Sequence, residues 1–216
     1  MKVYSVKEAY VTLQGEGAQT GRAAVFLRFA GCNLWSGLER DRARAVCTFC
    51  DTDFVGTDGV NGGQFVGPKA LADHVLSVWR NAGPTSGRPY VVCTGGEPAL
   101  QLDAAAIAAL KVRGFDIGIE TNGTLALPEG IDWVCVSPKA NAPLRQMSGD
   151  ELKLVFPQPE KQAQPEQFIG LQFKHFFLQP KDDMRQAENI AAAAAYCIKH
   201  PKWRLSLQTH KLIGLP

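Results

Sequence analysis

The sequence predicts an α/β fold with a mostly parallel sheet, and two features of the residue pattern support this prediction. Short apolar segments alternate with longer segments of helical periodicity along the 216 residues, an order typical of repeated strand–helix units. Several apolar segments are nearly continuous, as in strands that are buried on both faces of a parallel sheet. Such units need right-handed crossovers and form either an open doubly wound sheet or a barrel.

The expected strands are short apolar segments bounded by Gly, Pro or Asn. In chain order they are 24–30, 90–94, 115–120, 133–137, 152–156 and 175–179, followed by an alternating segment at 203–207. The expected helices lie between them, at 68–81, 102–113 and 184–200, with a weaker helical pattern at 159–169. No repeat or low-complexity linker divides the chain, and the segment 157–165 reads as a surface loop. One domain over residues 1–216 is therefore predicted.

Composition and charge exclude several classes of protein. Hydrophobic residues make up 45% and charged residues 20% of the chain, which is an ordinary globular balance. The net charge of +2 gives no support to a nucleic-acid-binding surface. The longest apolar run, 190–198, is far shorter than the roughly 20 residues that span a bilayer. The first residues contain no apolar signal segment, so we expect a cytoplasmic protein without a membrane partner.

Polar clusters follow five of the expected strands. Because the carboxyl ends of parallel strands meet at one edge of the sheet, these clusters should form a single site. They are Gly31-Cys32, Thr94 to Pro98, Glu120 to Gly123, Ser137 to Lys139, and Gln179 to Asp182.

The six cysteines fall into two groups. Three lie within apolar segments and are expected to be core residues, namely Cys93, Cys135 and Cys197. The other three, Cys32, Cys47 and Cys50, lie beside turn or polar residues. Fourteen residues separate the first two of these and two separate the second pair, with no fourth Cys or His nearby. A structural zinc ion usually needs four protein ligands, whereas three thiolates suit a [4Fe–4S] cluster with one open iron.

The chain resembles the radical S-adenosylmethionine enzymes in three features. These are the three cysteines, Phe49 just before the third cysteine, and Gly95-Gly96-Glu97 after a strand. That superfamily binds its cluster in a loop after the first barrel strand. Its usual first gap is three residues, so the insert 33–46 extends the cluster loop. Residues 39–44 of the insert are expected to form a short solvated helix, to which no chemistry is assigned.

The chain also resembles a particular family, the 7-carboxy-7-deazaguanine synthases of queuosine biosynthesis. The features that carry this resemblance are the long gap between the first two cysteines, the segment Leu13 to Gly17, Arg28, and the segment Cys50 to Asp53. The resemblance implies a partial, mostly parallel (β/α) barrel and a carbon–nitrogen lyase. It implies contraction of 6-carboxy-5,6,7,8-tetrahydropterin to 7-carboxy-7-deazaguanine with loss of ammonia. It also implies a [4Fe–4S] cluster, S-adenosylmethionine, Mg²⁺, an electron donor such as flavodoxin or ferredoxin, and a homodimer.

The same resemblance implies roles for individual residues. Cys32, Cys47 and Cys50 would bind the cluster, and Thr52 would bind Mg²⁺. The cofactor would contact Phe49, Cys50, Asp51, Gly96, Glu97, Ser137, Pro138, Lys139, Gln179, Pro180, Lys181 and Asp182. The substrate would contact Leu13, Gln14, Gly15, Glu16, Arg28, Thr94, His210 and the terminal carboxylate of Pro216.

Some of these roles have alternatives in the sequence. Arg28 lies on an apolar strand, where an unpaired charge would be costly, so it either binds the substrate carboxylate or forms an internal ion pair. His210 either transfers a proton or is structural. For the whole chain, one alternative is a radical activating enzyme that acts on a partner protein, and another is a zinc-binding interaction module.

Overall fold

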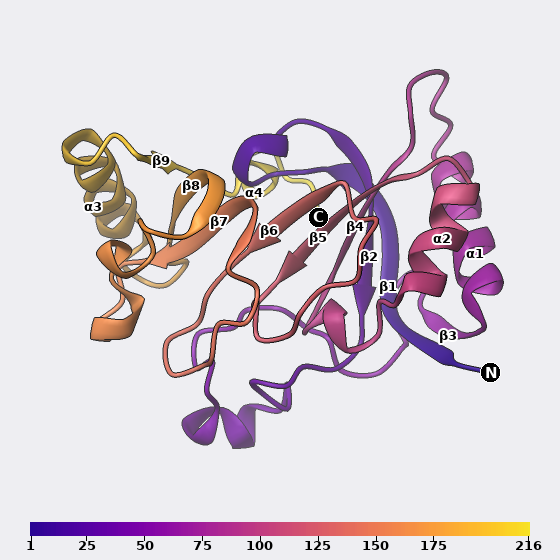
Figure 1. Ribbon diagram of the computed structural model, residues 1–216, viewed down its shortest axis with the longest axis horizontal. Coiled ribbons are helices and arrows are strands. Elements are labelled where there is room, and N and C mark those ends of the chain that lie inside the picture. Colours follow the sequence, from indigo (N-terminus) through magenta and orange to yellow (C-terminus); the bar gives the residue numbers. More distant parts are fainter.

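A nine-stranded sheet forms the centre of the structure, a computed structural model that describes all residues 1–216 (Figure 1). Its strand order is β3-β1-β2-β4-β5-β6-β7-β8-β9. Strands β3, β1 and β2 pair antiparallel, and every pairing from β2 to β9 is parallel. The strands are β1 (Val3–Leu13), β2 (Ala23–Phe29), β3 (Gly63–Val66), β4 (Tyr90–Gly95), β5 (Asp116–Thr121), β6 (Trp133–Val136), β7 (Ser148–Phe156), β8 (Gln172–Pro180) and β9 (Trp203–Leu205). This sheet is the mostly parallel α/β architecture that the sequence predicts.

Helices cover one face of the sheet at its two ends (Figure 1). They are α1 (Pro68–Asn81), α2 (Ala104–Val112) and α3 (Gln186–Lys199). The short α4 (Thr209–Leu212) lies in the C-terminal segment, on the other face of the sheet. The first begins at Pro68, whose missing N–H costs nothing at a helix start. The second begins at Asp103, whose side chain accepts a hydrogen bond from the Ala106 N–H. Helices α1 and α2 pack near β1, β2 and β5, and α3 packs against β8 and β9.

The strands place apolar and polar residues on opposite faces, because successive side chains of a strand alternate in direction. In β2, Leu27 belongs to the apolar core under α1 and α2, while Arg28 faces the other side. In β7, Leu152 and Leu154 belong to a second apolar cluster near α3, while Lys153 lies on the opposite face of the sheet, the same face as Arg28. Val134 in β6 contacts both clusters, so the core is continuous along the sheet.

Several expected elements differ from those observed. Strands β1 and β3 were not expected from the sequence, and the final strand ends at Leu205. The predicted helix at 159–169 is wrong: that segment contains two 3-10 turns, Lys161–Ala163 and Pro165–Gln167. Pro165 lacks the N–H that a continuous helix would need at this position. The insert forms a 3-10 helix at Glu39–Arg44 with no buried residue, as expected for a solvated turn.

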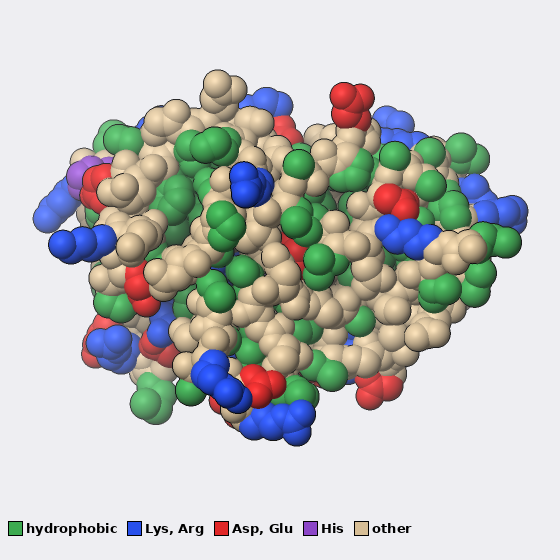
Figure 2. Space-filling view, turned by 60° about the horizontal axis from the view of Figure 1, so that its bottom comes forward, with side chains coloured by type: hydrophobic (Ala, Val, Ile, Leu, Met, Phe, Trp, Pro, Cys, Tyr) green, Lys and Arg blue, Asp and Glu red, His purple; other side chains and the backbone are tan.

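The surface carries charges of both signs. On the face shown in Figure 2, Lys and Arg side chains are scattered among acidic and uncharged groups and form no broad patch. None of the helices combines the length and apolarity that a bilayer-spanning segment requires.

Candidate active site

A cavity of about 600 Å³ opens at the carboxyl ends of the parallel strands, a volume within the range of small-molecule sites. The loops after β1, β2, β4, β5, β6 and β8 contribute to its wall, and so does the C-terminal segment 208–216. The sequence-predicted residues that line it are Leu13, Gln14, Glu16, Arg28, Cys32, Cys47, Phe49, Cys50, Asp51, Thr52, Thr94, Gly96, Ser137, Lys139, Gln179, Pro180, Lys181, Asp182, His210 and Pro216.

Three predicted site residues lie behind this wall: Gly15, Glu97 and Pro138. The Glu97 side chain is fully buried, and its carboxylate accepts hydrogen bonds from Thr121 Oγ1 (2.7 Å) and the Asn122 N–H (2.7 Å). Burial raises the pKa of Glu97, while these donors lower it. Glu97 therefore braces the loops after β4 and β5 instead of reaching into the cavity. A Cβ on Gly15 would lie 1.9 Å from His210 Nδ1, so only glycine fits there.

The cluster-ligand candidates Cys32, Cys47 and Cys50 all face the cavity from the loop after β2. A hydrogen bond from the Cys47 thiol lowers the pKa of Cys50 to about 6. Three convergent thiols fit a [4Fe–4S] cluster, which leaves one iron open, better than a structural zinc ion, which needs four protein ligands.

A buried ammonium group connects two carboxylates in the cavity wall. Lys153 Nζ forms ion pairs with Glu16 and with Glu120, the latter at 2.6 Å, and its side chain is 6% exposed. Burial alone would raise the pKa of Glu16, but the charge and hydrogen bond of Lys153 lower it to about 2. The amides of Gln179 and Gln208 also donate to Glu16, each at 2.8 Å. Glu16 is therefore a fixed anion in this wall.

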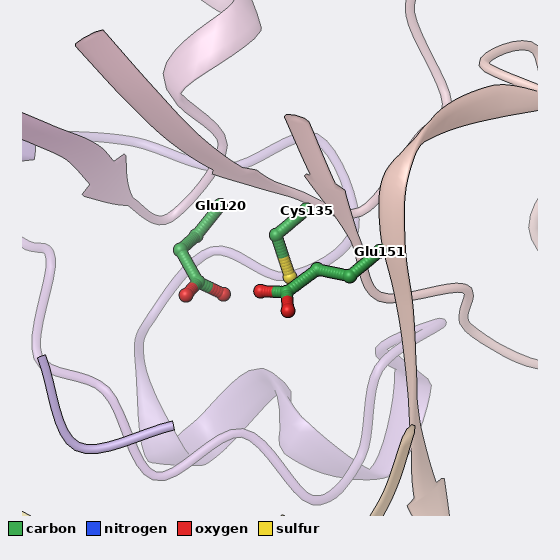
Figure 3. Close-up of side chains that lie close together, drawn as sticks. All are labelled: Glu120, Cys135 and Glu151. Carbon is green, nitrogen blue, oxygen red and sulfur yellow. The ribbon is translucent and has the colours of Figure 1, made fainter. Parts of the chain in front are cut away.

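Neighbouring strand positions extend this polar group, as Figure 3 shows for Glu120, Cys135 and Glu151. Glu120 pairs in register with Cys135, and Cys135 with Glu151, so the three side chains point toward one another from β5, β6 and β7. Their ligand atoms lie within 4.8 Å of one another. Burial raises the pKa of both Cys135 and Glu151, and the positive charge of nearby Lys153 opposes that effect. Cys135 is buried as predicted, but its surroundings are polar.

Arg28 forms an internal ion pair and also lines the cavity. Its Nε lies 2.8 Å from Glu8 Oε1, and Nη2 donates to the Tyr10 hydroxyl at 3.3 Å. Glu8 and Arg28 are directly opposite in the antiparallel pairing of β1 and β2. The pair uses one edge of the guanidinium fork, so remaining N–H groups are available to a ligand.

The C-terminal segment closes over the cavity through contacts with several loops. The Thr12 hydroxyl donates to the Pro216 carbonyl oxygen at 3.1 Å, and the Thr209 N–H donates to the Gly15 carbonyl at 2.9 Å. Lys211 Nζ lies 3.3 Å from Asp51 and 2.5 Å from Asp182. Burial lowers the pKa of His210. One segment therefore contacts the expected substrate residues and the expected cofactor loops.

Sequence reasoning missed Glu8, Lys153 and Lys211 as residues of this site, and it placed Glu120 at the rim without assigning it a role. Lys153 carries the same signal as Arg28, because it is a single charge within an apolar strand. Glu120 is the last residue but one of β5, at the predicted rim. Glu8 lies on β1, which was not expected, and Lys211 gives no signal in the sequence.

A mostly parallel partial barrel, with three convergent cysteines and a Gly-Gly-Glu turn at its carboxyl rim, defines a radical S-adenosylmethionine enzyme. The chain is 63% identical to 7-carboxy-7-deazaguanine synthase from Caulobacter vibrioides and 61% identical to that from Bordetella pertussis, each over 99% of both chains. The crystal structure of QueE from Escherichia coli matches with a TM-score of 0.68 and 26% identity, over 95% of this chain and 93% of that chain. No family model matches the chain. The chain belongs to the 7-carboxy-7-deazaguanine synthase family.

Proposed function

We propose that this chain converts 6-carboxy-5,6,7,8-tetrahydropterin to 7-carboxy-7-deazaguanine and ammonia. The observation that carries the proposal is one cavity that contains both the three thiols and the Glu16–Lys153–Glu120 group. Substrate and product differ by one ammonia, so the overall reaction consumes no net oxidant. The C-terminal segment lines this cavity together with the strand ends, which favours a small-molecule substrate over a protein substrate.

The residues present fit the cofactors of this family. Cys32, Cys47 and Cys50 would hold a [4Fe–4S] cluster, with S-adenosylmethionine beside it against Gly96 and the loops 137–139 and 179–182. When bound, the cluster and S-adenosylmethionine supply the radical that starts the reaction. Gln179 supports this fit, because its Oε1 is buried without a hydrogen-bond partner while its amide binds Glu16. A ligand N–H would satisfy that oxygen.

The part of the wall around Glu16, Glu120 and Arg28 suits a flat, carboxylated pterin. The aminopyrimidinone edge presents adjacent N–H groups, and the Glu16 and Glu120 carboxylates would accept them. Arg28 would bind the substrate carboxylate through the N–H groups that Glu8 leaves unused. The apolar lining and the C-terminal segment would keep water from a reactive radical.

Thr52 and the dimer belong to the same proposal. Thr52 lines the cavity between Asp51 and Asp53, so its hydroxyl could complete an oxygen shell around Mg²⁺ with substrate oxygens and water. Both acidic neighbours of Thr52 line the cavity and each is paired with a lysine, Asp53 with Lys7 at 2.9 Å and Asp51 with Lys211 at 3.3 Å. A homodimer and an electron donor of the flavodoxin or ferredoxin type complete the proposal.

An anaerobic turnover assay tests the proposed reaction. The reconstituted chain, a reductant, S-adenosylmethionine and the carboxylated pterin should yield the deazapurine and one equivalent of ammonia. Cys47→Ala should lose iron and turnover together, whereas Cys197→Ala, on α3 outside the cavity, should keep both. A reconstituted chain that holds its iron but forms no deazapurine would refute the proposal.

A further inference from the structure

The insert 33–46 has a structural connection to the cysteine turn that the proposed reaction does not explain. Its 3-10 helix, Glu39–Arg44, buries no residue and therefore adds nothing to the core. One of its side chains, Arg42, nevertheless points back to the turn Cys47–Cys50. Arg42 Nη1 donates to the carbonyl oxygens of Thr48 and Cys50, each at 3.0 Å.

These two carbonyls have no other hydrogen-bond donor in the chain. The turn lies outside any helix or strand, so no backbone ladder fixes its carbonyls. The Thr48 carbonyl is exposed and that of Cys50 is half-buried. A half-buried carbonyl without a donor is costly, and a guanidinium group with several N–H groups can bind two carbonyls at once. Arg42 therefore fixes the backbone on both sides of Phe49.

The other contacts of Arg42 connect the turn to the first cysteine. Its guanidinium carbon lies 4.1 Å from the ring centroid of Trp35, three residues after Cys32. Trp35 is buried and packs edge-on against Phe54, with ring centroids 5.6 Å apart. The two oxygens of Glu39 accept from Arg42 Nε at 2.8 Å and orient the guanidinium group.

The ends of the insert are also joined through the backbone. The Leu34 carbonyl accepts from the N–H groups of Val46 (3.0 Å) and Cys47 (3.4 Å). A fourteen-residue gap between two metal ligands increases the entropy that is lost when they meet. Contacts formed before the metal arrives reduce that cost, because the ligands are already positioned.

We propose that Arg42 is a positioning residue of the cluster site. It clamps the Cys47–Cys50 turn against Trp35 and places a fixed positive charge beside Cys50. This inference rests on the assignment of Cys32, Cys47 and Cys50 as cluster ligands in the proposed function. It gives the insert a role in holding the cluster and in setting its reduction potential, since nearby charge and hydrogen bonds tune such potentials.

The test compares Arg42→Gln with Arg44→Gln in the full chain, reconstituted anaerobically with iron and sulfide. Arg44 is a matched control, because its replacement removes the same charge from the same 3-10 helix, yet its side chain is 86% exposed and approaches only Asp41, at 3.8 Å. The readouts are the rate of iron release to a chelator, the midpoint potential of the cluster, and the unfolding temperature of the metal-free chain. None of these requires turnover.

Arg42→Gln should release iron about 10- to 100-fold faster than the parent, as is usual when a group supporting metal ligands is removed. Its midpoint potential should be more negative, and Arg44→Gln should match the parent in both. The metal-free unfolding temperature should fall only slightly, because Arg42 satisfies one half-buried carbonyl while its 3-10 helix buries no residue. Equal iron release and equal potentials for the two variants would overturn the inference.

Two further variants are informative. One separates the effect of the charge of Arg42 from that of its shape, and the other tests the cysteine ligands independently of Arg42. Arg42→Lys keeps the positive charge but lacks the planar guanidinium group. The midpoint potential of its cluster should therefore stay near that of the parent, while iron release should be faster than in the parent. Iron release at the parent rate would contradict the proposal that Arg42 holds the Cys47–Cys50 turn. This variant also decides the question if Arg42→Gln does not fold. Cys47→Ala should lose iron altogether. If it keeps its iron, the ligand assignment fails, which differs from a failure of Arg42 alone.

Discussion

Arg28 and Lys153 are single charged residues of otherwise apolar strands, and both side chains lie on the face of the sheet that lines the cavity. Arg28 is paired across two antiparallel strands with Glu8, and Lys153 is paired with carboxylates from two different segments. Both alternatives that the sequence left open for Arg28 are compatible with this geometry, because an ion pair and a ligand can share one guanidinium group.

Arg28→Ala should raise the KM for the carboxylated pterin, because it removes a charge-assisted pair worth about 1.5–3 kcal/mol, or roughly 10- to 150-fold. Iron content should stay normal. Steady-state kinetics provide the measurement, with Arg22→Ala as the control: Arg22 pairs with Asp116 at 2.6 Å and does not line the cavity. An unchanged KM would assign Arg28 to the Glu8 pair alone.

Glu16 should make folding stability depend on acid. Its pKa is about 2 in the folded chain against an ordinary 4.5, so the unfolded chain binds a proton more readily. The ionised carboxylate therefore contributes its full stabilisation above about pH 4.5, and this stabilisation is lost as the pH falls toward 2. The folding equilibrium constant should decrease by up to about tenfold for each pH unit in this range. Thermal unfolding of the parent and Glu16→Gln should differ more at pH 5 than at pH 3.5; a constant difference would contradict this assignment.

At the scale of elements, β7 joins two environments. Its buried residues Glu151 and Lys153 belong to the polar group of the cavity, while Leu152 and Leu154 pack in the apolar cluster near α3. The same strand therefore supports both the core and the site.

Lys153→Met should destabilise the fold by about 3–5 kcal/mol, because it leaves two carboxylates in the wall without their shared cation. Urea unfolding measures this change. Lys174→Met on the neighbouring strand β8 is the control, since Lys174 is 71% exposed and pairs with Asp150 at the surface. We expect that variant to lose at most about 1 kcal/mol. Similar losses for the two variants would show that Lys153 is not a buried pair.

The parallel strands and the helices α1, α2 and α3 could be predicted from the sequence because apolar periodicity and turn residues determine them locally. Strand β1 could not, since its charged residues Lys7 and Glu8 find partners only in the folded chain: Asp58 at 2.8 Å and Arg28. The segment 159–169 shows the opposite error. Its helical pattern is real, but proline overrides it.

The site was predictable in its location more than in its internal contacts. Polar residues at strand ends and the three cysteines indicate the rim directly. Lys153 and Lys211 each have one partner more than 100 residues away, Glu16 and Asp51 respectively, and a nearer one, Glu120 and Asp182, so no local pattern reveals their roles.

At the scale of the whole molecule, the last nine residues connect parts of the chain that the sheet keeps apart. They contact Thr12 at the end of β1, Asp51 in the cluster loop and Asp182 after β8. The cavity is therefore closed by a segment that belongs to none of its strands.

An extension of a few residues after Pro216 should weaken binding of the pterin at least about tenfold, which corresponds to roughly 1.4 kcal/mol. It would place bulk where the Thr12 hydroxyl meets the Pro216 carbonyl oxygen. Iron content and S-adenosylmethionine binding should be unchanged. The same residues placed before Met1, which is fully exposed, are the control. Equal substrate affinity for the two extended chains would show that the segment only packs against the protein.

The alternation in β7 also limits how this gene can change in length. Deleting one codon within the strand would reverse the direction of every later side chain, so Lys153 would enter the apolar cluster and Leu152 or Leu154 would face the cavity. A substitution at the same place changes one contact only. We therefore expect insertions and deletions among relatives to avoid β7 and to fall in surface segments such as 82–89, where most residues are exposed and no helix or strand is interrupted.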